Sequence, residues 1–348
     1  MASEAVAPVG SKVWLWVRRV AVGLAGVLLL LVLAGAVYEF FARRSAASAY
    51  PPPGRLVDIG GRRIHLDCRG SGAPVVILES GLDVNGSLAW YKVHDALAKK
   101  TRTCAYDRAG IMWSDPSNGV RDGDHVARDL HAALTAADID GPLVLVGHSL
   151  GGPYIMNYTR QFGGAVKGLV FVDASHPDQL EKLVPPGKEK MKVELPVAVR
   201  ALSALAWAGL PRVLSGALSP EEDSAVTPAR NAYTPTSLPR MIDELESLEI
   251  TLRQAGTFRT LSDRPLVVLS GAKPYPKAVL AAQGLSEAEG RAQLARWLDL
   301  HRDEARWSTQ SRHEILPDAG HYVQMDRPDS VINAVNGVVD QVRAGVED

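Results

Sequence analysis

Short apolar segments recur along the chain from Arg55 onward, and stretches with helical periodicity separate them. A short run with no polar position is typical of a strand that is covered on both faces, as in a parallel sheet. Three such runs predict strands at residues 74–78, 168–172 and 265–269. We expect further strands at residues 101–106, 143–146 and 314–316. Residues 63–69 alternate between polar and apolar side chains, which predicts a half-buried strand.

Helical segments fall between these strands. Val126, Leu130 and Leu134 recur every four positions and mark one face of a helix. Further helices are expected at residues 87–100 and after Pro328. Strands that alternate with helices predict an α/β domain, with a mostly parallel sheet and helices on both faces.

The N-terminal segment has a different pattern. Residues 20–38 form an uncharged apolar run close to the roughly 20 residues that a helix needs to cross a bilayer. We expect residues 1–50 to be a retained single-pass anchor. The alternative is a secreted protein with a cleaved signal peptide, since Ala34-Gly35-Ala36 resembles a cleavage site, but signal peptides have shorter apolar regions of about 7–15 residues. Basic residues before the run outnumber those just after it, which favours an extracytoplasmic main domain.

Residues 175–262 interrupt the alternation, because no strand pattern occurs between residues 172 and 265. Helical patches lie at residues 197–205 and 238–252 of this insert. We therefore divide the globular part into a core, residues 51–174 and 263–348, and a helical insert, residues 175–262.

The most informative motif is Gly147-His148-Ser149-Leu150-Gly151, which follows an apolar strand and precedes a helical pattern. A serine at such a strand-to-helix turn has its hydroxyl exposed, and the two glycines allow the backbones to approach closely. The N–H of Leu150 then lies at a helix start, where it can bind a developing oxyanion. Ser149 is the predicted nucleophile.

Four landmarks in this order resemble the α/β-hydrolase fold family, in particular capped serine esterases and lipases, over nearly all of the chain from Arg55. They are Glu79-Ser80-Gly81-Leu82, Tyr106-Asp107-Arg108-Ala109-Gly110 followed by Trp113-Ser114-Asp115-Pro116, the serine turn, and Gly320-His321. Two positions depart from the family pattern. Glu79-Ser80-Gly81 stands where many members carry His-Gly, and Met112 stands where many carry glycine.

The resemblance implies the rest of a catalytic triad. His321, in the loop after the last strand, is the expected base, and His176 is the alternative. Many members place the acid after the strand that corresponds to residues 265–269, but residues 270–277 contain no Asp or Glu. Some lipases use the end of the preceding strand, which gives Asp173 here, although Asp173 could instead cap a turn. Glu287 is a further candidate for the acid, but the loop would need an unusual path to bring it to His321.

The resemblance implies further features around the serine. The backbone N–H groups of Leu82 and Leu150 are the expected oxyanion donors. The insert is expected to form a cap above Ser149. Its apolar residues would line a substrate pocket or form the cap's own small core; they are Ala206, Trp207, Leu210, Val213, Leu214 and Leu218. Asp107 and Arg108 are interpreted as a structural ion pair or turn.

The two cysteines, Cys68 and Cys104, lie on strands that this fold places side by side. They form either a disulfide, if the domain faces an oxidising compartment, or two buried thiols.

Composition and charge argue against several classes of function. The formal net charge is −1 with no extended basic run, which argues against nucleic-acid binding. No metal or cofactor motif is present, so none is expected. We expect a membrane-anchored serine hydrolase that cleaves apolar carboxylic esters. The alternatives are amide, peptide or carbon–carbon bond hydrolysis, or a ligand-binding or sensor protein with a slow or silent triad.

Overall fold

The computed structural model describes residues 9–345 except 186, 188, 194 and 219–224. The strands are β1 (Arg55–Asp58), β2 (Arg63–Arg69), β3 (Val75–Glu79), β4 (Thr103–Tyr106), β5 (Leu143–His148), β6 (Val166–Val172), β7 (Leu266–Gly271) and β8 (Ser311–Leu316). The core helices are η1 (Gly86–Trp90), α2 (His94–Ala98), α3 (Gly123–Ala136), α4 (Gly151–Phe162), α10 (Lys277–Ala282), α11 (Glu287–Glu304), η3 (Ala305–Trp307), α12 (Val323–Asp326) and α13 (Pro328–Ala344).

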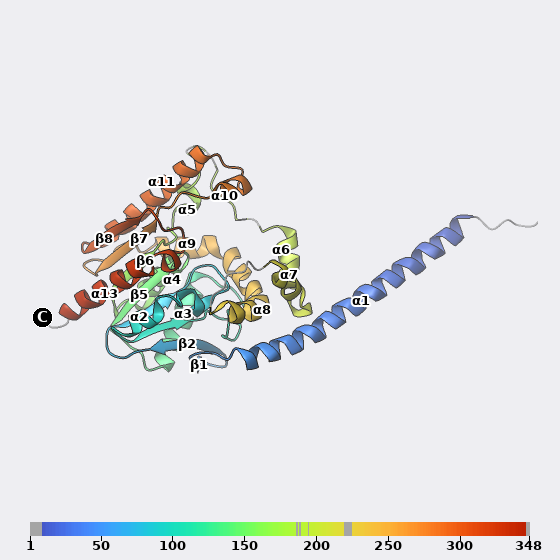
Figure 1. Ribbon diagram of the computed structural model, residues 1–348, viewed down its shortest axis with the longest axis horizontal. Helices are drawn as coiled ribbons and strands as arrows, with labels where there is room; N and C mark the ends of the chain where they lie inside the picture. Colours follow the sequence, from blue (N-terminus) through green and yellow to red (C-terminus); the bar gives the residue numbers. More distant parts are fainter. Residues whose placement is uncertain (1–8, 186, 188, 194, 219–224, 346–348) are drawn as a thin grey trace, which may run out of the picture.

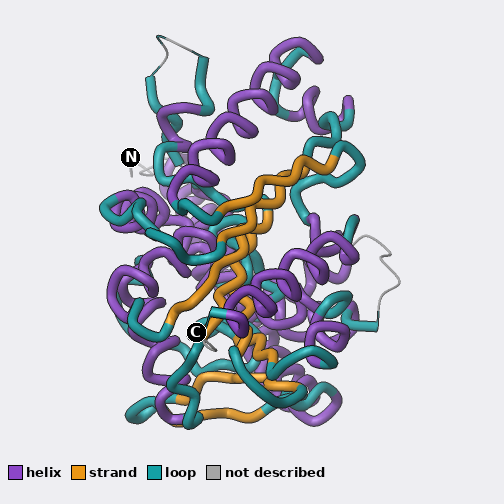
Figure 2. The backbone as a smooth tube through the Cα atoms, turned by 90° about the vertical axis from the view of Figure 1, so that its left-hand side faces the viewer, coloured by secondary structure: helices purple, strands orange, loops and turns teal. Residues whose placement is uncertain are grey.

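The strands form one sheet in the order β1-β2-β4-β3-β5-β6-β7-β8. β1, β2 and β4 pair antiparallel, and all pairs from β4 to β8 are parallel, as the apolar runs predict. Helices cover both faces of this twisted sheet (Figure 2). Buried side chains of α3 and α4 form the core on one face, and those of α2 and α13 form the core on the other. The predicted fold class is confirmed.

Two details of the core differ from the predicted elements. β1, with only four residues, was not predicted. The helix predicted at residues 87–100 is divided into η1 and α2, because the buried side chain of Asp107 accepts the Ser87 N–H at 2.6 Å and fixes a tighter first turn.

Five helical segments and one 3-10 turn lie between β6 and β7 in the chain: α5 (Gln179–Lys182), α6 (Val197–Ala204), η2 (Ala206–Ala208), α7 (Leu210–Leu218), α8 (Thr227–Glu246) and α9 (Leu248–Gly256). The helical patch predicted at residues 238–252 spans the junction of α8 and α9. The break falls at Ser247, whose N–H bonds back to the carbonyls of Asp243 and Glu244. We refer to α5–α9 as the cap.

The N-terminal helix α1 (Val9–Ala49) is one continuous helix that contains the apolar run of residues 20–38 and ends shortly before β1 (Figure 1). Within the described part of the chain, α1 is the one helix that is long and apolar enough to cross a membrane. Its apolar side chains are exposed.

A disulfide joins Cys68 of β2 to Cys104 of β4, which are directly paired across the sheet. Of the two interpretations of these cysteines, the structure has the bridge. We predict that the Cys68→Ala/Cys104→Ala variant loses roughly 3–4 kcal/mol of stability, because the bridge restricts a long loop in the unfolded chain. Urea unfolding with and without reductant measures this. If reduction changes the wild type but not the variant, the bridge is the cause, whereas equal stability of both proteins would contradict the prediction.

Candidate active site

Ser149 lies at a sharp turn between β5 and α4, at the carboxyl edge of the sheet. Its φ of 53° is in the left-handed region, which costs a non-glycine residue about 1–3 kcal/mol and is typical of functional turns. The turn needs glycine at its close contacts. A Cβ on Gly151 would lie 2.4 Å from the Glu79 carbonyl oxygen, and one on Gly147 would lie 2.6 Å from the backbone of Gly151.

The structure brings His321 and Asp173 to Ser149. His321 Nε2 is 2.9 Å from Ser149 Oγ, and His321 Nδ1 is 2.6 Å from Asp173 Oδ2. β5 and β6 are neighbours in register, with His148 opposite Val172, so the residues that follow them emerge side by side. His321 reaches the same point from the loop after β8. The three side chains form one hydrogen-bonded line.

Asp173 is held firmly from its other side. Its Oδ1 accepts the Gly271 N–H at 2.8 Å and the Trp297 indole N–H at 3.1 Å. Burial by itself raises the pKa of Asp173, but the hydrogen bond from His321 and the nearby imidazole of His301 outweigh it, so the net pKa is lowered. The carboxylate therefore remains ionised. Trp297 was not predicted, because a single tryptophan within α11 has no motif.

The loop after β3 approaches the serine closely. A Cβ on Gly81 would lie 2.9 Å from Ser149 Cβ, so only glycine fits there. The N–H groups of Leu82 and Leu150, the predicted oxyanion donors, have no hydrogen-bond partner among the described residues. Leu150 follows Ser149 directly, and Leu82 follows Gly81, which lies close to Ser149, so both N–H groups remain available to a ligand.

Arg108 fixes this loop from behind. Its guanidinium donates to the carbonyls of Ser80 at 2.9 Å and Gly81 at 2.7 Å. The same group forms buried ion pairs with Glu79 at 2.7 Å and with Glu244 of the cap at 2.9 Å. Of the ion pair or turn expected at Asp107 and Arg108, the structure has a turn, in which the Arg108 carbonyl accepts the Ile111 N–H at 2.9 Å, and the two side chains do not pair with each other. The Asp107 carboxylate instead bonds the His65 imidazole at 2.7 Å.

Replacing Arg108 tests this bracing. We predict that Arg108→Lys lowers kcat by up to about 10²-fold. The compact ammonium of lysine cannot bind two carbonyls and two carboxylates at once, as the planar guanidinium does. The loop that carries the Leu82 N–H would then shift, and a small displacement of an oxyanion donor lowers the rate strongly. Arg121→Lys is the matched control, since Arg121 also pairs with Glu244, at 3.1 Å, but donates nothing to the loop. Steady-state kinetics on a soluble ester, with melting temperatures, would contradict the idea if both variants lost kcat equally.

The other histidines near the site have separate partners. Burial and the adjacent His321 lower the pKa of His148 to about 3, and this neutral ring donates to the His321 carbonyl at 2.9 Å. His176, the alternative base, is held by Asp303 at 3.1 Å and does not contact Ser149. The structure therefore brings His321, and not His176, to the serine.

Glu304, at the end of α11, is fully buried, and its Oε2 has no hydrogen-bond partner within the described residues. Burial, with the nearby charges of Asp173 and Asp303, raises its pKa well above 4.5. The folded state then keeps a proton that the unfolded chain releases, so stability falls as the pH rises above about 4.5.

Glu304→Gln should remove this dependence. We predict similar melting temperatures for variant and wild type at pH 5, and a variant that melts higher at pH 8 by about 3 °C or more. Calorimetry at both pH values measures the difference. A constant gap between the two proteins would mean that Glu304 does not titrate as its burial implies.

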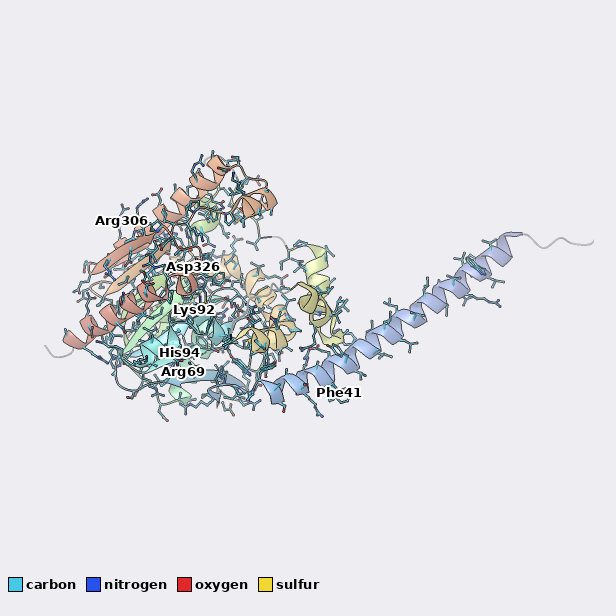
Figure 3. All side chains as sticks on the ribbon, in the orientation of Figure 1. Phe41, Arg69, Lys92, His94, Arg306 and Asp326 are labelled. Atoms are coloured by element: carbon cyan, nitrogen blue, oxygen red, sulfur yellow. A yellow bond between two sulfur atoms is a disulfide. The ribbon has the colours of Figure 1, made fainter. Side chains whose placement is uncertain are left out.

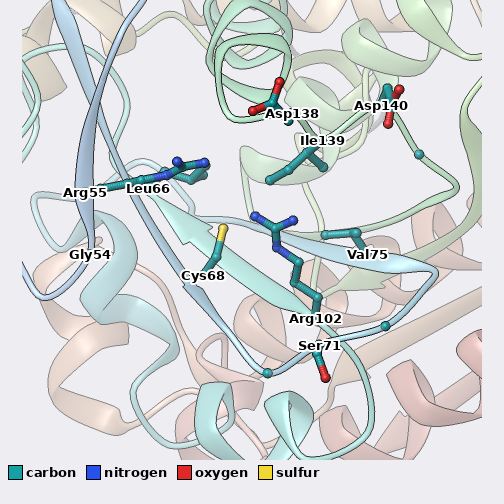
Figure 4. A pocket seen from close by; sticks show the side chains of 13 residues that line it. Gly54, Arg55, Leu66, Cys68, Ser71, Val75, Arg102, Asp138, Ile139 and Asp140 are labelled. Carbon is teal, nitrogen blue, oxygen red and sulfur yellow. The ribbon is translucent and has the colours of Figure 1, made fainter.

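A cavity of about 610 Å³ lies against His321. It is lined by Asn85, Leu88, Ala89, Tyr91, Lys92, Val226, Arg230, Tyr322, Met325 and Asp326; Lys92 and Asp326 are labelled in Figure 3. A second cavity, of about 710 Å³, is on the opposite edge of the sheet, where Arg102 extends beside Cys68 (Figure 4). This second cavity lies at the start of β3 and β5, whereas Ser149 follows the end of β5, so the two are far apart. The cavity against His321 is therefore the candidate substrate site.

Comparison with known proteins shows the family to which the chain belongs. The model of the α/β hydrolase fold family matches residues 73–328, so the chain belongs to this family. The uncharacterized protein YbdG of Bacillus subtilis is 25% identical over 181 residues, which are 52% of this chain and 56% of that protein. The chain thus matches only about half of this relative's length.

Solved structures share the fold. An esterase from Thermogutta terrifontis superposes with a TM-score of 0.59 at 18% identity, over 82% of this chain and 97% of that one. An esterase from Exiguobacterium antarcticum gives a TM-score of 0.57 at 18% identity, over 82% of this chain and 99% of that one. Among the described residues, no cluster of His, Cys, Asp or Glu could hold a metal ion.

Proposed function

We propose that this protein is a membrane-anchored serine hydrolase that cleaves carboxylic esters through an acyl-enzyme. The single observation that carries the proposal is the continuous hydrogen-bonded line from Ser149 Oγ through His321 to Asp173. A hydroxyl is a weak nucleophile, and a base held by a buried carboxylate is the arrangement that activates it.

The mechanism follows from these contacts. His321 Nε2 takes the proton as Ser149 Oγ attacks the ester carbonyl, and Asp173 stabilises the resulting imidazolium. The N–H groups of Leu82 and Leu150 bind the oxyanion, each donor contributing on the order of 3 kcal/mol. His321 then protonates the leaving alcohol. Water, deprotonated by His321, attacks the acyl-enzyme, and collapse of the second tetrahedral intermediate releases the acid and restores Ser149.

An ester with an apolar chain fits the apolar part of the cavity against His321, and this part lies beside the charged Lys92, Arg230 and Asp326. Its wall next to His321 includes Leu88, Ala89, Val226 and Met325, which would contact an acyl or alcohol chain. The esterases of similar fold support an ester, but their low identity leaves the substrate to the test below.

The anchor is the second part of the proposal. α1 exposes its apolar side chains over the predicted span of residues 20–38, and a helix that was part of a soluble core would bury them. A disulfide between β2 and β4 is suited to an oxidising compartment, which supports an extracytoplasmic hydrolase domain. Secretion after cleavage is the rival, and the mass of the N-terminal peptide of the mature protein distinguishes them.

A fluorophosphonate probe tests the chemistry. We expect it to label the detergent-solubilised full chain at Ser149 and to leave Ser149→Ala unlabelled. A series of p-nitrophenyl esters of increasing acyl length would then define the preferred chain. A wild type that is neither labelled nor active on any ester would overturn the proposal in favour of a ligand-binding or sensor role.

A further inference from the structure

Part of the cap exposes apolar side chains with no covering element among the described residues. α6 has the sequence VAVRALSA, yet none of its residues is buried, and Val197 is 82% exposed. η2 and α7 continue this surface with Trp207, 54% exposed, and Val213, 62% exposed. Apolar surface gathered in this way marks an interaction site. We call Val197, Trp207, Leu210, Val213 and Leu214 the cap patch.

The prediction of pocket lining holds for only part of the cap patch. Ala206 and Trp207 line a cavity of about 480 Å³ beside α1, although Trp207 is also 54% exposed, whereas Leu210, Val213 and Leu214 are exposed and line no cavity described above. The side chain of Leu218 lies outside the described residues. The exposed parts of Trp207, Leu210, Val213 and Leu214 are therefore available to contact another surface.

The anchor helix fixes the position of the patch. A Cβ on Gly35 of α1 would lie 2.3 Å from the Ala208 carbonyl oxygen, so η2 packs directly on the backbone of α1. One turn further along, Glu39 is buried and accepts from Arg212 of α7 at 2.7 Å. Figure 1 shows α7 near α1, and α6 beyond α7, on the side where α1 leaves the domain. The cap and the anchor are thus joined at this point.

The contact determines the depth of the patch. Gly35 lies three residues before Tyr38, the end of the apolar run, and at 1.5 Å per residue this is about 5 Å inside that end. An α1 that spans a bilayer therefore places η2 and its Trp207 at the membrane interface. Tryptophan is enriched at that level, and apolar faces of interfacial helices enter by about 5–10 Å.

We propose that the cap patch inserts into the interface of the same bilayer that holds α1. This inference rests on the anchor in the proposed function and goes beyond it, because the cap itself becomes a lipid-binding surface. The anchor and the patch contact the bilayer together, so the cap is held against the membrane instead of moving on a free tether.

A single fluorophore tests the depth. The full chain carrying Val213→Cys is labelled with the environment-sensitive dye NBD and reconstituted into phosphatidylcholine vesicles. The native cysteines are in the disulfide, so one thiol reacts. The matched control is Ile315→Cys, an exposed position on β8, at the opposite sheet edge from β1 and α1. We expect NBD at 213 to shift to the blue and lose emission to nitroxide-labelled lipids, and NBD at 315 to do neither.

The outcomes separate the two proposals. A protein that floats with the vesicles while NBD at 213 is quenched only by aqueous iodide would overturn the inference and leave the anchor intact. A dye shielded from both quenchers would mean that protein covers the patch, which also overturns it. A protein that does not float would refute the anchor and the inference together.

Discussion

Ser149→Ala should reduce kcat for a soluble p-nitrophenyl ester by about 10⁴ to 10⁶-fold, because the Ser149 hydroxyl is the group that is bonded to His321 Nε2 and would accept the acyl chain. Residual hydrolysis would come from the oxyanion donors and substrate binding, which do not depend on the hydroxyl. Alanine is smaller than serine and can adopt the same backbone conformation, which has a φ of 53° in the wild type, so the fold should be retained. Steady-state kinetics and melting temperature give both quantities.

Ser175→Ala is the control for this change. Ser175 follows Asp173 closely, and its backbone N–H bonds the Ser149 carbonyl at 2.8 Å, but its hydroxyl has no place in the hydrogen-bonded line. We expect its kcat to stay within about threefold of the wild type, because the substitution removes only a hydroxyl that takes no part in the chemistry. Equal losses in the two variants would show that local structure, not the nucleophile, was disturbed.

The second large effect is expected at Asp173. Asp173→Asn should lower kcat by about 10⁴-fold near neutral pH, because an amide cannot stabilise the imidazolium and favours the wrong tautomer of His321. The Gly271 N–H and the Trp297 N–H both donate to Oδ1, so the amide oxygen would stay there and its NH₂ group would face His321 Nδ1. His321 would then present Nε2 as a donor to Ser149, which is the opposite of a base.

Glu287→Gln provides the comparison, since Glu287 is the other acid considered for this role. It lies on the surface at the start of α11 and pairs with Lys277 at 2.9 Å. Its kcat should be unchanged. Activity of Asp173→Asn within tenfold of the wild type, or a loss at Glu287 instead, would reject Asp173 as the orienting acid.

The sequence predicted those features that a local pattern of apolar residues or a short motif determines. The central parallel strands β3, β5, β6 and β7 were found because a strand buried on both faces is apolar at most positions. Ser149 was found because its turn has a characteristic spacing of glycines. His321 and Asp173 follow strands, and the fold that the motifs resemble brings strand ends to one edge; the structure then shows the contacts between them.

The remainder depends on contacts between distant residues. Trp297 reaches Asp173 across 124 positions, and Arg108 reaches Glu244 across 136, with no local signal for either pair. β1 escaped notice because four residues are too few to show alternation. The outward direction of Trp207 and Val213 depends on how η2 and α7 rest on α1, and composition alone does not reveal which way an apolar helix faces.

The buried guanidinium of Arg108 has a consequence for engineering. Chimeras that exchange caps between hydrolases treat that segment as an independent module. In this chain the guanidinium binds one carboxylate from each module, Glu79 and Glu244. A transplanted cap without an acid at the position of Glu244 would leave a positive charge half-neutralised beneath the catalytic loop. Chimeras built on this scaffold should therefore keep an acid at the position of Glu244 in α8.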